Sequence, residues 1–127
     1  MRERRLLQVA VAAAGLVPVT AGAIGALRPE LLIAGPAHAL THTAYLSGLL
    51  LGLGLAFWSL IPAIEQQGRL FGLLTGLVVL GGLARALAAF RLGAWSLPVT
   101  LPLGMELGVT PALWLWQRRV ARKSSSN

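Results

Sequence analysis

The stretch VVLGGLARALAAF, residues 78–90, places a single arginine, Arg85, inside an otherwise apolar run. A charge at such a position is costly in a membrane unless another group compensates it. The run belongs to a longer apolar segment, residues 70–90, and about 20 apolar residues are enough for a helix to cross a bilayer. The stretch therefore predicts a transmembrane helix with one charged position that needs a partner.

The composition of the whole chain also indicates a membrane protein. Of its 127 residues, 56% are hydrophobic and only 12% are charged, whereas soluble domains are about 25% charged. The net charge is +7, but the basic residues stand beside apolar runs rather than in one polar patch. We therefore expect the partner to be a lipid bilayer with anionic inner-leaflet lipids, and no nucleic acid. The absence of cysteine excludes a disulfide framework and a thiolate metal site.

The apolar residues fall into four segments, each about long enough to cross a bilayer. These segments are residues 6–27, 43–64, 70–90 and 97–116. Two of the connections are short, so the helices that they join must be antiparallel. The sequence predicts an all-α, polytopic membrane protein: one domain over residues 1–127, an up-down bundle of four transmembrane helices, with a basic cytoplasmic tail at 117–127. The first apolar run is too long for a signal peptide, so we expect a retained helix.

The distribution of lysine and arginine predicts the orientation. Eight of them would lie on one side of the membrane: Arg2, Arg4, Arg5, Arg69, Arg118, Arg119, Arg122 and Lys123. Only Arg28 and Arg91 would lie on the other. The positive-inside rule then predicts a multi-pass protein with both termini in the cytoplasm.

Glu106 is the predicted partner of Arg85, because it is the only acidic residue within the four apolar segments. The third and fourth helices would run antiparallel, which puts the two residues at depths that differ by about 6 Å at 1.5 Å per residue. An arginine side chain can span that offset, and intramembrane charges usually pair. The pair is predicted either to hold the two helices together or to form a ligand-binding or proton-handling site. A third alternative is that Arg85 extends to the outer headgroups.

A second group of candidate residues lies in GPAHALTHTAYLSG, residues 35–48. If Pro36 begins the helix early, His38, His42 and Tyr45 share one face at the outer interface. Two histidines four residues apart suit a metal, but a third ligand would have to come from Glu30 or Glu106. We expect these histidines to bond water and headgroups, with no metal or other cofactor; a metal or quinone-type site is the alternative.

Glycine and proline predict where helices approach and where backbone groups are left unpaired. Gly48-x-x-x-Gly52 and Gly72-x-x-x-Gly76 have the spacing of close helix contacts in membranes. Pro102 and Pro111 stand on either side of Glu106, and each deprives an earlier carbonyl of its donor. A water-lined cavity is therefore predicted near Glu106.

Four stretches resemble a family of bacterial four-helix membrane proteins, domain-of-unknown-function family 4345. They are YLSGLLLGLGLAFW, IEQQGRLFGLL, LGGLARALAAF and MELGVTPALWLW, within residues 45–116. The resemblance implies a "RYLSG" opening to the second helix, "GGLGR" on the third and an acidic residue on the fourth. Residues 45–48, residues 81–85 and Glu106 fit, whereas Ala44 replaces the arginine. The resemblance directs attention to Arg85 and Glu106 and implies no activity.

Known catalytic and nucleotide-binding motifs are absent from the sequence, so no catalytic residue is predicted and an enzyme is not expected. Two classes of function remain. The first is a structural or accessory membrane subunit in which Arg85 and Glu106 form an intramembrane ion pair, as a homodimer or in a larger membrane complex. The second is a small dimeric transporter or lipophilic-ligand-binding protein that uses Glu106 and Arg85.

Overall fold

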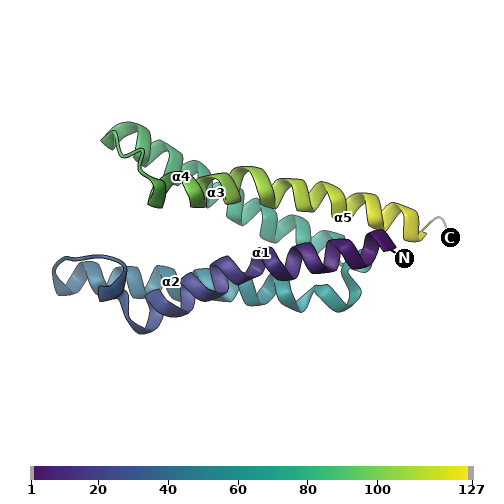
Figure 1. Cartoon of the computed structure of the whole chain (residues 1–127), viewed down its shortest axis with the longest axis horizontal. Coiled ribbons are helices and arrows are strands. Elements are labelled where there is room, and N and C mark those ends of the chain that lie inside the picture. Colours follow the sequence, from purple (N-terminus) through teal and green to yellow (C-terminus); the bar gives the residue numbers. More distant parts are fainter. Residues whose placement is uncertain (1, 126–127) are drawn as a thin grey trace. The chain divides into compact units, whose positions relative to one another are not determined.

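The computed structural model of the chain describes residues 2–125, and every regular element in that range is helical (Figure 1). In chain order the elements are α1 (Arg2–Leu27), η1 (Pro29–Leu31), α2 (Ala37–Ser59), η2 (Ile61–Gln66), α3 (Gly68–Leu92), α4 (Leu97–Gly104), η3 (Met105–Val109) and α5 (Thr110–Ser125). The prediction of an all-α protein is thus confirmed over the described residues. Ser126 and Asn127, the end of the predicted tail, lie outside them.

The chain divides into two compact units, and the first comprises Gln8–Pro62. In this unit α1 packs on α2 through glycines, because a Cβ added at Gly22 would lie 2.5 Å from the backbone nitrogen of Leu51. Two polar side chains tie the other end of the same pair of helices. Trp58 Nε1 donates a hydrogen bond of 3.1 Å to the carbonyl of Ala12, and Gln8 Nε2 donates one of 2.7 Å to the carbonyl of Ile61.

The second unit comprises the described residues of 1–7 and 63–127, with α3 packed along α5 and η3. Gly93 ends α3 in the left-handed conformation at φ 64°, where a residue with a side chain would be strained. The backbone N–H of Ala94 then bonds the carbonyl of Ala89 at 3.0 Å. This tight turn reverses the chain, so that α4, η3 and α5 return antiparallel to α3.

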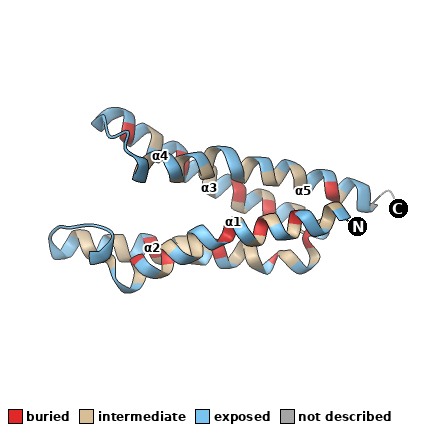
Figure 2. Cartoon of the chain, in the orientation of Figure 1, coloured by how far each residue is buried: buried red, intermediate tan, exposed pale blue. Residues whose placement is uncertain are grey.

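Within residues 2–125, three helices are long and apolar enough to cross a membrane: α1, α2 and α3. Their surfaces are apolar as well, and Figure 2 shows exposed residues along much of their length. Leu80 and Leu87 of α3, for example, are 64% and 53% exposed. Large apolar side chains on the outside of a helix are typical of lipid-facing surfaces. The predicted fourth helix, residues 97–116, is divided between α4, η3 and α5, and none of these reaches membrane length alone.

The second helix is displaced toward the N-terminus from its predicted range of 43–64, and two prolines account for the shift. Pro36 is the residue before the helix, with extended backbone at φ −71° and ψ 163°, so α2 begins at Ala37. At the other end Pro62 has no N–H group to bond the carbonyl of Trp58, and α2 ends at Ser59. The chain continues as η2, with a kink at Ala63.

The segment predicted as a basic tail, residues 117–127, is helical as far as the structure describes it. The helix α5 continues through to Ser125 and carries its basic residues on two faces. Arg119 and Lys123 pair with Glu3, with Arg119 Nε 3.1 Å and Lys123 Nζ 2.6 Å from its carboxylate oxygens. These ion pairs fix one face of the last turns of α5 to the beginning of α1 within the second unit.

The two predicted glycine motifs do not mark the close contacts. A Cβ added at Gly48, Gly52 or Gly76 would meet no neighbouring atom within 4 Å in the described part of its own unit, so these three residues mark no close helix contact there. Only Gly72 has a close neighbour, with Trp114 Nε1 3.1 Å from its added Cβ. The spacing of glycines alone does not determine which side of a helix is covered.

Candidate functional site

The structure brings Arg85 and Glu106 together within the second unit. Arg85 lies on α3 and Glu106 on η3. Arg85 Nη2 is 3.1 Å from Glu106 Oε1, and Arg85 Nε donates to both carboxylate oxygens at 3.2 Å. The side chain of Glu106 is 18% exposed, whereas that of Arg85 is 41% exposed. The carboxylate is therefore largely covered by the chain, and the guanidinium is open on one side.

Gly82 lets η3 approach α3 closely enough for this contact. It lies one turn before Arg85 and is buried. A Cβ added there would be 2.9 Å from Glu106 Cβ and 2.9 Å from Leu107 Cδ2. Gly81, its neighbour, has open space instead. Of the small residues around Arg85, Gly82 and Ala89 are buried and Ala88 is exposed.

Glu106 stands in a π-helical turn, and Pro111 offers a physical reason for that turn. In a regular α-helix the ring of Pro111 would meet the carbonyl of Leu107, and that carbonyl would lose its donor. In η3 the backbone N–H of Thr110 bonds the carbonyl of Met105 instead, five residues back. The Thr110 hydroxyl donates to the same carbonyl at 3.0 Å. Such wide turns within helices are rare and occur frequently at functional sites.

His38, His42 and Tyr45 lie in the first unit, on the opening turns of α2, and all three are exposed. Their common helix makes them neighbours along one side, as the spacing predicted. Within the described residues there is no group of three or more histidine or acidic side chains that could hold a metal. Glu30, one of the two ligands considered, pairs with Arg28, whose hydrogen bond holds the pKa of that carboxyl below its ordinary value.

Sequence reasoning missed a set of polar contacts at the other end of the second unit. Arg4 Nε lies 2.5 Å from Glu65 Oε2, and this hydrogen bond lowers the pKa of the Glu65 carboxyl. Gln117 is fully buried, and its Nε2 donates a hydrogen bond of 2.8 Å to the carbonyl of Ile64. The sequence signal for these contacts is Gln117 itself, a glutamine between Trp116 and Arg118. A buried amide requires hydrogen-bond partners, so its burial would have predicted polar contacts here.

Residues 6–117 match the model of the family described as Domain of unknown function (DUF4345). The chain belongs to this family. The match covers most of the chain and confirms the resemblance inferred from its motifs. No curated protein and no solved structure matches the chain. The family therefore assigns no biochemical role, and the chemistry has to be argued from the residues themselves.

The stretches that carried the resemblance coincide with contact points inside each unit. In the first unit Ser47 is buried, and its Oγ is the atom nearest to a Cβ added at Gly25. In the second unit Gly82 contacts Glu106 and Arg85 pairs with it. These motif residues thus lie where two helical segments meet.

Proposed function

We propose that the protein is a small integral membrane protein of the bacterial inner membrane that serves as a structural or accessory subunit of a larger membrane assembly. In this proposal α1, α2, α3 and the continuous run α4–η3–α5 are four spans of an up-down bundle within one domain, and both termini are cytoplasmic. The contact between Arg85 and Glu106 carries the proposal, because it joins two antiparallel segments at membrane depth.

The uneven exposure of the pair supports an accessory role rather than an isolated bundle. Arg85 is 41% exposed, and a charge exposed to lipid is costly. A helix of another subunit, or of a second copy of this chain, would remove that cost by covering the guanidinium. In such an assembly the pair both holds η3 to α3 and presents a polar group to the neighbouring subunit.

The π-helical turn favours a second candidate, a small dimeric transporter or lipophilic-ligand-binding protein that uses Glu106 and Arg85. The wide turn includes an acidic residue next in sequence to Leu107, whose backbone carbonyl Pro111 leaves without its regular donor. Intramembrane charges often mark substrate pathways. In this alternative the open side of Arg85 receives an anionic or polar group of the ligand.

Extraction from native membranes distinguishes the two candidates. The tagged chain is purified in a mild detergent, and native mass spectrometry measures the mass of what it retains. The accessory role predicts a defined protein complex. Because Arg85 is proposed to face the neighbouring subunit, replacing both Arg85 and Glu106 by leucine should weaken that complex. The ligand-binding role predicts a retained small molecule that disappears in the same double variant. Recovery of the bare chain alone would contradict both.

The proposed topology makes a separate prediction. Single cysteines in place of Ser124, near the end of α5, and Ala94, in the turn after α3, should lie on opposite sides of the membrane. An impermeant thiol reagent added to intact cells should label the Ala94→Cys protein and leave the Ser124→Cys protein unlabelled until the membrane is opened. Labelling of both from outside would overturn the four-span arrangement, because one span, α4–η3–α5, is proposed to cross the membrane between the two positions.

A further inference from the structure

A groove between the beginning of α3 and α5 has the size and the lining of a binding site. It has a volume of about 460 Å³. The residues that line it are Gly68, Arg69, Gly72, Trp114, Gln117, Arg118, Ala121 and Arg122. Three of these are arginines and none is acidic, so the groove favours an anion. The whole groove lies in the second unit, and neither Arg85 nor Glu106 lines it.

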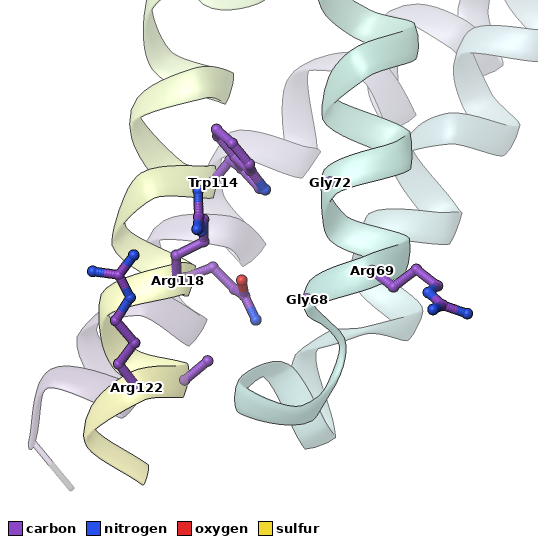
Figure 3. Close-up of a pocket in the computed structure, with 8 residues that line it drawn as sticks. Gly68, Arg69, Gly72, Trp114, Arg118 and Arg122 are labelled. Carbon is purple, nitrogen blue, oxygen red and sulfur yellow. The ribbon is translucent and has the colours of Figure 1, made fainter. Parts of the chain in front are cut away.

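The basic residues of α5 divide between two faces, and only one face belongs to the groove. Arg119 and Lys123 are paired with Glu3. On the groove side, the guanidinium of Arg118 lies over the ring of Trp114, 5.1 Å from its centroid. Figure 3 shows Trp114 projecting toward Gly72 and Arg118 extending back to the indole, whereas Arg69 projects away from α5. Stacking on an indole fixes the plane of the guanidinium and leaves its edge N–H groups available for an anion.

The beginning of α3 contributes donors to the same groove. Gly68 is the first residue of this 25-residue helix, and the side chain of the preceding Gln67 makes no capping hydrogen bond. The first backbone N–H groups of a helix have no partner within it, and they favour anions. Gly68 and Arg69 both line the groove, so these groups lie beside it.

Gln117 supplies an independent observation that points to a ligand. Its side chain is fully buried, and Oε1 has no hydrogen-bond partner among the described residues. Exchanging the positions of Oε1 and Nε2 would break a hydrogen bond, because Nε2 donates to the carbonyl of Ile64 at 2.8 Å. The group left over is therefore an acceptor. An anion alone cannot satisfy an acceptor, so a ligand that fits here must also carry a donor.

We propose that this groove binds a phosphodiester that carries a neighbouring hydroxyl group, as in the headgroup of an anionic, polyol-bearing phospholipid. The phosphate lies against Arg118 and the first N–H groups of α3, and the hydroxyl donates to Gln117 Oε1. An ammonium headgroup also carries donors, but the guanidinium of Arg118 beside Trp114 repels it. A hydroxyl is the donor that such a cationic groove accepts.

The test compares lipids that differ by one group. The purified full chain in neutral mixed micelles is titrated with phosphatidylglycerol or phosphatidylmethanol, which share one negative charge and differ in the hydroxyls. Binding is measured by native mass spectrometry. One additional hydrogen bond should make phosphatidylglycerol bind about threefold to tenfold more tightly. Phosphatidylethanolamine should bind more weakly than either.

Variants separate the groove from general attraction to basic residues. Arg118→Gln should weaken phosphatidylglycerol binding by about tenfold or more, because it removes a charge-assisted hydrogen bond. The matched control Arg119→Gln removes the same charge from the face paired with Glu3 and should change binding by less than about twofold, since screened surface charges contribute little. Gln117→Leu should abolish the preference for phosphatidylglycerol over phosphatidylmethanol. If Gln117→Leu fails to fold, the comparison of Arg118→Gln with Arg119→Gln still tests whether the groove binds the lipid.

A soluble competitor distinguishes the source of the ligand. Glycerophosphoglycerol carries the same phosphodiester and hydroxyls without acyl chains. If it displaces the lipid at similar concentration, the groove recognises a phosphodiester with a hydroxyl, and its ligand is a soluble polyol phosphate. Failure to displace would support a lipid. Equal binding of the two anionic lipids, with equal losses in Arg118→Gln and Arg119→Gln, would overturn the proposal. None of these measurements depends on the orientation in the membrane or on the Arg85–Glu106 pair.

Discussion

Replacing Gly22 by alanine is expected to destabilise the packing of α1 on α2 by about 3 kcal/mol, the upper end of the usual cost of overpacking. The added methyl group would lie 2.5 Å from the backbone nitrogen of Leu51, 2.8 Å from Leu51 Cα and 2.8 Å from the carbonyl oxygen of Ser47. All three are main-chain atoms of α2. Rotating a side chain therefore cannot relieve the overlap, and α2 itself must move. The gain in helix propensity from glycine to alanine, about 1 kcal/mol, offsets only part of this.

Gly52→Ala on α2 is the matched control. The same methyl group there meets no neighbouring atom within 4 Å in the described chain, so the variant should keep or slightly raise the melting temperature of the detergent-solubilised protein. Tryptophan fluorescence follows both unfolding transitions, because Trp58 bonds the carbonyl of Ala12 across the same pair of helices. Equal melting temperatures for the two variants would show that α1 does not approach α2 at Gly22.

This contrast also shows why the helices could be predicted from the sequence and their contacts could not. Apolar length and short connections are local signals, and they placed α1 and α3 within a few residues of their observed limits. Which glycine faces a neighbour depends on the rotation of each helix about its axis. In chains as apolar as these, the hydrophobic pattern leaves that rotation undetermined, and Gly22 and Gly82 rather than Gly48 and Gly52 are covered.

The candidate site was predictable to a similar extent. Two opposite charges in otherwise apolar antiparallel segments have few alternatives to pairing, so Arg85 and Glu106 could be matched from spacing alone. The π-helical turn could not be foreseen, because Pro111 could equally have kinked a regular helix. The groove at Gln117 was missed for another reason. Its components come from the start of α3 and the end of α5, and nothing local in the sequence joins residues 68 and 117.

Removing one member of the Arg85–Glu106 pair is expected to cost about 1–3 kcal/mol, less than the ~3–5 kcal/mol typical of a fully buried pair because Arg85 is 41% exposed. Glu106→Leu leaves the Arg85 guanidinium without its carboxylate, and Arg85→Leu leaves a largely covered carboxylate without a cation. The second change should be the more harmful, since Glu106 is only 18% exposed. Either variant should lower the melting temperature and the yield of folded protein from membranes.

The double variant Arg85→Leu, Glu106→Leu decides whether the two residues act as a pair. It removes both charges together, so no uncompensated group remains, and it should recover most of the stability lost in the single variants. Recovery of stability together with a weakened protein assembly is the result expected if the pair holds η3 to α3 and also contacts a neighbouring subunit. Recovery of stability with loss of a retained ligand would instead favour the binding or transport alternative. If both single variants melt like the parent protein, the interaction contributes nothing to stability. In that case the proposal that the pair lies within the membrane is wrong, because an unpaired charge there is costly.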